Sequence, residues 1–340
     1  ICACLVGSEM CIRDRYRTEQ FVNDGGAGNA RPYYNGYYSD REGNQKAANH
    51  VVMLRNTSKG HSLYTTFQLQ KNFVDGILKG LYLNGSYSFG QSRGVTDGTS
   101  SVATSAWKYR AALDGNAEEV GYTAGSFDGR LLLSASYTAN WSKYAATSFG
   151  LIYQRYRPFR YSYCYNGDAN GDSQFSNDLM YIPANFDEVK DHLLPGDFDS
   201  QEDAWKAMNA FIEQDPYLSK HRGEYAERNG AVAPFANQLD LSVSHDIKIY
   251  QKNGRSHTLR FSFNIANFLN LLNRNWGVVQ TTVLGNQQYQ FLTIPKGQGP
   301  SAANNYTLKY TMAKDLDETF KDNLNDVSRW QMQFGIKYIF

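Results

Sequence analysis

The sequence lacks any run of about 18 or more apolar residues, which excludes a transmembrane helix of the usual kind. It also has little net charge, since 34 Lys and Arg stand against 33 Asp and Glu. This balance gives no support for a nucleic-acid partner. The 4 cysteines are few and unevenly placed. Cys2, Cys4 and Cys11 lie at the start and Cys164 stands alone, which excludes a disulfide framework and the usual zinc-ligand spacings.

The motifs of common hydrolases and metalloenzymes are missing too. The 6 histidines are scattered, with no His-Glu-x-x-His pair, and there is no Gly-x-Ser-x-Gly turn. Cys164 has no evident base, and the acids between Asp197 and Asp203 are expected to solvate a loop and the start of a helix. The sequence therefore predicts that the chain is not an enzyme, with no catalytic residue and no certain cofactor.

Residues 1–15, ICACLVGSEMCIRDR, do not have the basic start, apolar centre and small-residue cleavage site of a signal peptide. Their SEMCIRDR part resembles translated adapter sequence found at the ends of gene fragments. We therefore expect residues 1–15 to be an artefact or, alternatively, a disordered N-terminus, with the natural chain beginning further upstream. The protein proper then comprises residues 16–340.

Aromatic residues are what the chain has in abundance: 25 Tyr, 19 Phe and 5 Trp, beside 29 Gly and a mean hydropathy of −0.55. A chain that is rich in aromatics, polar on average and poor in helical periodicity is expected to be all-β. A transmembrane β-barrel has the same composition, because only alternate residues of its strands face lipid.

Alternation of apolar and polar residues is the strongest pattern in the sequence. In 130–141 the odd positions are Leu, Leu, Ala, Tyr, Ala and Trp, whereas the even positions are mostly polar. Residues 238–249 alternate in the same way, with His245 as the one break on the apolar side. The pair Asn253-Gly254 then predicts a hairpin to the next strand. The final residues, 330–340, alternate cleanly and end in Phe.

The pattern predicts about ten antiparallel strands, each near the length that crosses a bilayer at a tilt. The clear candidates are 63–69, 81–89, 131–141, 149–165, 239–249, 259–265 and 330–340, and the weaker ones are 51–54, 276–284, 288–294 and 306–312. Short turns are expected at 72–77, 142–146 and 251–255, and long extracellular loops at about 91–129, 166–237 and 295–328. The second long loop is expected to hold one short helix, 201–214, with Trp205, Met208, Phe211 and Ile212 on one face.

A soluble β-sandwich or barrel would also alternate. Two features favour a transmembrane barrel instead. The polar faces carry Ser, Thr, Asn, Gln and Tyr more than Lys and Glu, as a water-filled lumen requires. The apolar faces carry Tyr, Trp and Phe near strand ends, as the aromatic girdles of a barrel do. We expect the chain to form part of such a barrel.

One polar stretch is a candidate metal site: residues 167–183, GDANGDSQFSNDLMYIP. Asp168, Asn170 and Asp172 occupy positions one, three and five of a D-x-N-x-D calcium pattern, and Asp178 follows. Position six is Ser173 where an EF-hand needs Gly, and Asp178 comes one residue early for the last ligand. The stretch is therefore not an EF-hand.

Two interpretations of this stretch remain open. In the first, its four polar side chains and the backbone carbonyl of Gln174 hold a Ca²⁺ ion. In the second, Asp and Asn side chains cap turns at Asn166-Gly167 and Asn170-Gly171 through their own backbone. The aromatic residues of the long loops also have two interpretations. They could contact a ligand, or they could pack the loops against each other, and we favour packing. These residues are Trp107, Tyr109, Tyr165, Trp205 and Tyr217.

Five stretches are distinctive when taken in order: 56–73, 162–183, 210–243, 263–278 and the last strand, RWQMQFGIKYIF. The first reads NTSKGHSLYTTFQLQKNF and the fourth reads FNIANFLNLLNRNWGV. Together they resemble TonB-dependent outer-membrane receptors of the Oar-like type, which carry a carboxypeptidase-regulatory-like domain. The final strand also resembles the C-terminal strand of bacterial outer-membrane proteins in general.

The resemblance implies a barrel of about 22 strands, plugged by an N-terminal domain, in the bacterial outer membrane. It implies that outer-membrane lipid, TonB and the barrel-assembly machinery are partners, and that a large or scarce substrate is moved with energy from TonB. Because no plug, TonB-contacting segment or signal peptide occurs in the sequence, we expect it to be the C-terminal part of the barrel. The alternative is a passive porin or a surface adhesin without energy coupling. No motif identifies the substrate, its binding residues or the direction of transport.

Overall fold

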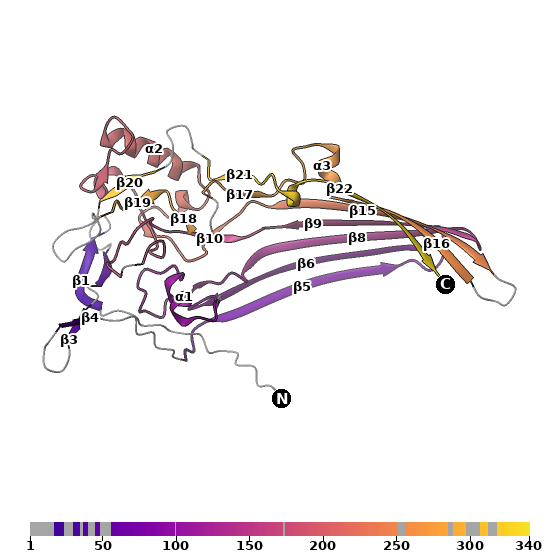
Figure 1. The fold of residues 1–340 in the computed structure, drawn as a ribbon, viewed down its shortest axis with the longest axis horizontal. Helices are drawn as coiled ribbons and strands as arrows, with labels where there is room; N and C mark the ends of the chain where they lie inside the picture. Colours follow the sequence, from indigo (N-terminus) through magenta and orange to yellow (C-terminus); the bar gives the residue numbers. More distant parts are fainter. Residues whose placement is uncertain are drawn as a thin grey trace.

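Strands dominate the computed structural model, which describes residues 17–23, 30–34, 37–39, 45–47, 56–98, 100–172, 174–250, 256–284, 288–296, 307–311 and 318–340. One large antiparallel sheet extends along the molecule, and a group of packed loops lies at one end of it (Figure 1). None of the helices in these residues is both long and apolar enough to cross a membrane. The expectation of a mostly β chain built from antiparallel sheet is confirmed.

Seven long strands form the main sheet, and each pairs antiparallel with its neighbours. In the order of the sheet they are β22 (Gln331–Ile339), β16 (Ser256–Ala266), β15 (Ala236–Tyr250), β9 (Ala145–Tyr156), β8 (Phe127–Ser142), β6 (Leu81–Gly94) and β5 (His61–Asn72). The short β7 (Gly121–Tyr122) pairs with β6. Three of the six pairs, β5–β6, β8–β9 and β15–β16, are joined by short connections, as in hairpins, and the other three are joined through long stretches of chain.

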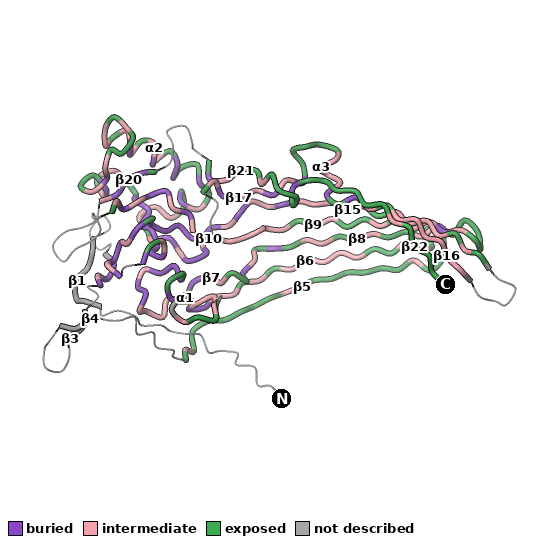
Figure 2. Tube along the Cα trace, viewed as in Figure 1, coloured by how far each residue is buried: buried purple, intermediate pink, exposed green. Residues whose placement is uncertain are grey.

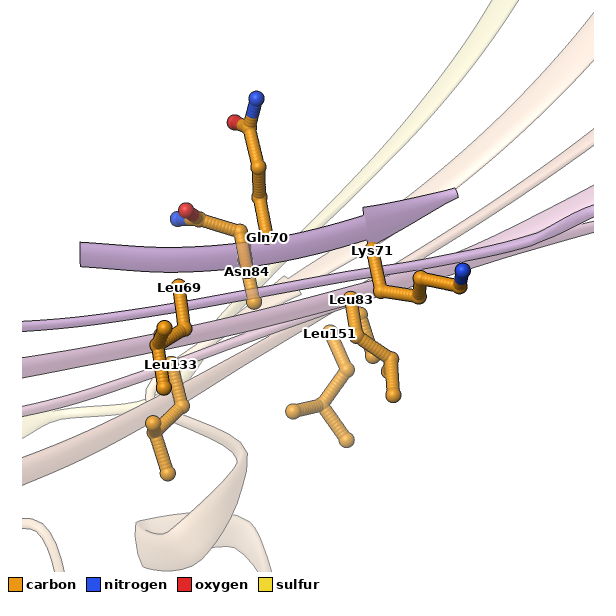
Figure 3. A pocket seen from close by; sticks show the side chains of 10 residues that line it. Leu69, Gln70, Lys71, Leu83, Asn84, Leu133 and Leu151 are labelled. Atoms are coloured by element: carbon orange, nitrogen blue, oxygen red, sulfur yellow. The ribbon is translucent and has the colours of Figure 1, made fainter. Parts of the chain in front are cut away.

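The strand register places apolar and polar residues on opposite faces of the main sheet. One row across six strands is apolar: Leu81, Tyr137, Phe149, Val243, Phe263 and Phe334. The adjacent row on the other face is Tyr82, Ser136, Gly150, Ser242, Asn264 and Gln333. Figure 3 shows the same division, because Leu69, Leu83, Leu133 and Leu151 extend from one face and Gln70 and Asn84 from the other.

The polar face is held by hydrogen bonds between side chains of neighbouring strands. Thr66 and Ser88 hydroxyls lie 2.9 Å apart, and Gln68 Nε2 donates to Asn84 Oδ1 at 2.8 Å. Arg260 donates from two of its nitrogens to the carboxylate of Asp246 at 2.6 and 2.7 Å. Such cross-strand pairs stabilise a sheet by roughly 0.2–1 kcal/mol each, and they fix the register that keeps the two faces distinct.

Within the described residues, the expected number of long strands was too high. The described parts of 276–284, 288–294 and 306–312 hold strands of only two or three residues: β17 (Gln280–Thr282), β18 (Gln288–Tyr289), β19 (Leu292–Thr293) and β20 (Leu308–Tyr310). Alternation of apolar and polar residues over so few positions is the same in a short strand within a loop and at the end of a long strand, so the sequence does not distinguish them. The expected strand at 51–54 and the hairpin turn at 251–255 lie outside the described residues.

The predicted strand 149–165 is interrupted. β9 ends at Tyr156, and the chain resumes pairing only at β10 (Arg160–Tyr163). Pro158 lies in the gap, and proline has no backbone N–H to donate to a sheet. β10 therefore leaves the main sheet and pairs antiparallel with β14 (Ala231–Val232) and parallel with β18.

The packed loops form a unit with its own core, which we call the loop domain. It comprises the described parts of 95–126, 157–235 and 288–311, together with β2 (Ala30–Tyr34). Figure 2 shows that buried residues gather here, whereas the main sheet is mostly exposed or half-buried. The core includes Tyr161, Tyr163, Tyr165, Met180, Met208, Phe211, Ile212, Tyr289, Phe291 and Tyr310. The long loops are thus folded against each other and not extended separately.

The predicted loop helix is confirmed as α2 (Gln201–Gln214). The hydroxyl oxygen of Ser200 caps it by accepting a hydrogen bond from the Asp203 N–H at 3.1 Å, as an N-cap serine does. Met208, Phe211 and Ile212 are buried, and Trp205 packs against the core at its edge. Two further short helices, α1 (Ala103–Lys108) and α3 (Phe268–Leu272), lie outside that loop.

The remaining described elements are short. They are β1 (Arg17–Asn23), β3 (Tyr37–Ser39), β4 (Gln45–Ala47), β11 (Tyr181–Ile182), β12 (Leu193–Leu194), β13 (Glu224–Tyr225) and β21 (Phe320–Asp322), with 3-10 turns η1 (Phe186–Glu188), η2 (Leu218–Lys220) and η3 (Asp326–Ser328). β1 pairs with β2, β3 with β4, β11 with β13, β12 with β20, and β17 with β21.

Candidate functional site

The candidate metal stretch lies inside the loop domain. We call residues 167–178 the acidic loop. It follows β10 in the chain. Both lie outside the main sheet, because the chain leaves the sheet at Tyr156. Isolated β-bridges connect the C-terminal end of the loop to the rest of the domain. They pair Asp178 with Ala112 and Leu179 with Cys164. Several loop-domain residues, including β10, therefore separate the acidic loop from the end of β9.

The first half of the acidic loop is a series of turns closed by side-chain oxygens. Asp168 Oδ1 accepts from the backbone N–H groups of Asn170 and Gly171, at 3.2 and 2.6 Å. Asn170 Oδ1 accepts from the Asp172 N–H at 2.9 Å, and Asp172 Oδ1 accepts from the Gln174 N–H at 2.7 Å. Each bond closes the local turn that Asp and Asn characteristically form, so the turn interpretation describes the backbone of this loop.

Asp178 joins the two ends of the acidic loop. Its Oδ1 accepts from Asn170 Nδ2 at 2.6 Å, and its Oδ2 accepts from the Ala169 N–H at 2.8 Å. The side chain is fully buried. Burial raises the pKa of the Asp178 carboxyl well above its usual range, the charges of Asp172 and Asp168 add to this, and Arg31 opposes it.

Arg31 is a residue of this site that the sequence did not indicate. It comes from β2, far from the acidic loop in sequence, and its side chain is fully buried. Its Nη1 lies 3.4 Å from Asp178 Oδ1, and its Nη2 donates to the Leu179 carbonyl at 2.7 Å. The guanidinium also lies 5.1 Å from the ring centre of Tyr165, within the range of a cation–π contact.

β2 is fitted closely against the acidic loop. The Tyr34 N–H donates to the Asn170 carbonyl at 2.7 Å, and the Tyr34 hydroxyl donates to Asp114. Gly171 has φ of +83°, and a Cβ placed there would lie 2.4 Å from the Tyr34 carbonyl oxygen. Only glycine satisfies both the left-handed backbone and this close approach. Burial raises the pKa of the Tyr34 phenol, so it remains a donor at neutral pH.

The structure thus brings the four predicted residues Asp168, Asn170, Asp172 and Asp178 into one hydrogen-bonded loop. In the part of the chain that the structure describes, no group of three or more His, Cys, Asp or Glu side chains is arranged to hold a metal ion. Carboxylates alone therefore do not make a metal centre here. Calcium binding stays a prediction, and any such site would need amide or backbone oxygens as well.

The loop aromatics mostly pack within the loop domain, as favoured above. Trp107 and Tyr165 are buried, and Trp205 and Tyr217 are partly buried against the core. The Tyr217 ring stacks on Tyr163 with centres 5.8 Å apart. Tyr109 differs because it is 65 % exposed. Of these aromatics, Tyr109 is thus the one available to a ligand on the surface of the loop domain.

We expect Cys164 to resist thiol reagents in the folded protein. Its side chain has no exposed surface, and burial raises the pKa of the thiol, so almost no thiolate forms at neutral pH. Peptide-resolved mass spectrometry after maleimide treatment should find Cys164 unmodified in the native protein and fully modified in denaturant. Rapid labelling of the native protein would contradict the packing of Cys164 against Leu179.

No protein-family model matches the chain, and neither a curated protein nor a solved structure matches it significantly.

Proposed function

We propose that this chain is part of the transmembrane barrel of a TonB-dependent outer-membrane receptor of the Oar-like type. The observation that carries the proposal is the exposed apolar face of the main sheet. Phe67, Leu69 and Phe334 are 64 %, 83 % and 65 % exposed, and they lie on strands from both edges of the sheet. Water-soluble proteins bury such a face, whereas a membrane barrel turns it toward lipid.

Strand length and sheet edges support the same proposal. The seven strands have 9 to 16 residues, and roughly 9–11 are needed to cross a bilayer at a tilt. In the described residues, β5 pairs only with β6, and β22 only with β16, so both edges of the main sheet are open. Lipid does not tolerate unpaired backbone groups, so further strands would have to close the sheet, and the resemblance suggests about 22 in all.

The leucine-lined groove on the apolar face fits this setting. It has a volume of about 410 Å³ and includes Leu69, Leu83, Leu133 and Leu151 (Figure 3). Its walls are aliphatic, and it is shallow and open along the strands. Such a surface suits the acyl chains of membrane lipid, which need no polar partner. We therefore assign the groove to lipid contact and not to substrate.

The loop domain is the proposed capture surface for the substrate. Long loops on one side of an outer-membrane barrel face the exterior, and short turns face the periplasm. Here the loop domain lies at one end of the sheet, and the short β8–β9 turn, which contains Tyr144, lies at the other (Figure 1). A preformed core holds the loops together, so substrate would meet an ordered surface. Transport with energy from TonB, and not catalysis, is the proposed activity.

Reconstitution of the complete receptor in a planar bilayer tests the mechanism. We expect almost no steady ionic current, because a plug domain would fill the barrel, and a large current after the plug is deleted. A large current from the untreated receptor would instead favour a passive porin. The complete reading frame provides a second test: a plug with a TonB-contacting segment supports transport, and a signal peptide leading directly into strands supports a porin or adhesin.

A further inference from the structure

Two side-chain amide oxygens of the acidic loop are buried without a hydrogen-bond partner. They are Asn177 Oδ1 and Gln174 Oε1, on side chains whose residues are 4 % and 6 % exposed. A buried carbonyl oxygen without a donor costs roughly 1–3 kcal/mol, so native proteins rarely leave one in that state. Both residues belong to the same loop, which points to a ligand shared between them.

The Asn177 amide is directed into the acidic loop. Its Nδ2 lies 3.4 Å from Asp172 Oδ2, a long distance for a hydrogen bond to a buried carboxylate. The unpartnered Oδ1 is on the same amide group, so it also lies beside the Asp172 side chain. The backbone of Gln174 is held to the other oxygen of this carboxylate, Asp172 Oδ1, at 2.7 Å. The Asn177 amide and the Gln174 backbone therefore both contact the Asp172 carboxylate, one at each oxygen.

We propose that the acidic loop binds one Ca²⁺ ion, held by carboxylate oxygens of Asp172 and Asp168 and by the side-chain oxygens of Asn177 and Gln174. Calcium is coordinated by charged carboxylate oxygens together with neutral carbonyl oxygens, and its coordination geometry is flexible. The ion satisfies both orphaned amide oxygens and offsets the cost of burying the Asp172 carboxylate.

Asp178 has a different role from the one the sequence suggested. Its carboxylate already accepts two hydrogen bonds within the loop, and the Arg31 guanidinium lies 3.4 Å away. A cation so close would repel a second one at the same oxygen. Asp178 therefore pairs with Arg31 and closes the loop, while the calcium ion lies on the Asp172 side.

The site would stabilise a specific part of the loop domain. Phe175 lies between the two amide ligands and is 66 % exposed, and Ser176 after it has φ of +78°. A left-handed serine is strained, so this segment needs support from its neighbours. A bound ion that ties Asp172 to Asn177 would restrain it. This proposal does not depend on the transport function, because it concerns the loop domain alone.

Chymotrypsin cleavage after Phe175 gives a local measurement on the full-length protein in detergent. We expect millimolar Ca²⁺ to slow this cleavage at least about tenfold relative to chelator, and calorimetry to show one site with a dissociation constant on the order of 10⁻⁵ to 10⁻³ M. Cleavage after Tyr144, which is 49 % exposed in the β8–β9 turn, should not change. Equal cleavage after Phe175 with Ca²⁺ and with chelator would overturn the proposal, as would Mg²⁺ binding as tightly.

Two substitutions separate a ligand from a structural residue. Asp172→Asn should weaken Ca²⁺ binding at least about tenfold, whereas the exposed Asp191→Asn should leave it unchanged. Asn177→Leu keeps the volume and removes the orphaned oxygen. In chelator, cleavage after Phe175 should be no faster in this variant than in the wild-type protein. Adding Ca²⁺ should no longer slow the cleavage of the variant. If Asn177→Leu still binds Ca²⁺ with wild-type affinity, Asn177 is not a ligand and the proposed site is wrong.

Discussion

Leu151→Arg is expected to destabilise the assembled protein by about 2–4 kcal/mol in a lipid bilayer, whereas Ile152→Arg has little effect. The two residues are adjacent in β9, both are aliphatic, and both are substantially exposed, at 37 % and 47 %. Their side chains point to opposite faces. Leu151 lies in register with Leu241 on the apolar face, and Ile152 lies opposite Asp240 on the polar face.

The physical reason lies in the solvent that each face meets. On the apolar face, an arginine near the middle of the strand would enter hydrocarbon, where its charge is poorly solvated. On the polar face, the same side chain would meet water and a carboxylate. In a water-soluble sheet, both positions would be wet and both substitutions would be tolerated. The pair therefore separates the two environments without any assumption about the substrate.

The measurement is the urea concentration at the midpoint of unfolding, for the complete receptor in lipid vesicles. The folded fraction is read from the heat-dependent migration of the receptor on gels. The midpoint should fall clearly for Leu151→Arg and stay within error for Ile152→Arg. The same two variants in detergent provide a control for direct damage to the strand. Equal midpoints in lipid would remove the main support for a membrane barrel.

Asp215→Ala is expected to destabilise the loop domain by about 3–5 kcal/mol. The Asp215 side chain is fully buried at the end of α2. Its Oδ1 accepts from the backbone N–H groups of Tyr217 and Leu218, at 2.9 and 2.8 Å. Its Oδ2 accepts from the hydroxyls of Tyr163 and Thr319, at 2.6 and 2.7 Å. Alanine would remove the shared acceptor of these four donors, two of which are backbone N–H groups.

Asp215→Asn is the matched variant, and it should recover at least half of the lost stability. Its remaining oxygen can still accept from the two backbone N–H groups. Its new NH₂ group faces the hydroxyls of Tyr163 and Thr319, and a hydroxyl can accept as well as donate. Tyr163 can then donate to Tyr161, whose hydroxyl oxygen is 3.3 Å away.

Hydrogen exchange at the Leu218 and Ser219 amides measures this effect on the loop domain directly. Exchange should become about 100-fold faster or more in Asp215→Ala, since each 1.4 kcal/mol is roughly tenfold in the opening equilibrium. Asp191→Asn is the surface control and should not change it. An effect below about 1 kcal/mol for alanine, or equal effects of alanine and asparagine, would show that the hydrogen bonds to Asp215 do not hold the domain together.

Local patterns in the sequence predicted the parts of the fold that depend on local physics. Alternation placed Leu133, Tyr137 and Phe149 on one face, because successive side chains of a strand point to opposite sides. The helix at 201–214 followed from its apolar spacing and its acidic start. Among the residues that the structure describes, the number of long strands was overestimated, because a two-residue strand and the end of a long strand show the same short alternation.

The candidate site was predicted only in part. The spacing of Asp168, Asn170 and Asp172 marked a loop in which oxygens converge, and the structure brings them together. The side chain of Asn177 gave no signal, because an Asn in a loop is usually a turn residue. Its importance follows from burial and from an oxygen that has no donor, and both are properties of the packed loop.

By itself, the sequence determined the two faces of the main sheet, the helix α2 and the position of the acidic loop, because each depends on side chains within a few residues of one another. Only the tertiary structure decided that β10 leaves the sheet and that the long loops share a core. It also decided that Arg31 meets Asp178. Such contacts join segments far apart in the chain, and they depend on how strands pair and loops close, which no local pattern encodes.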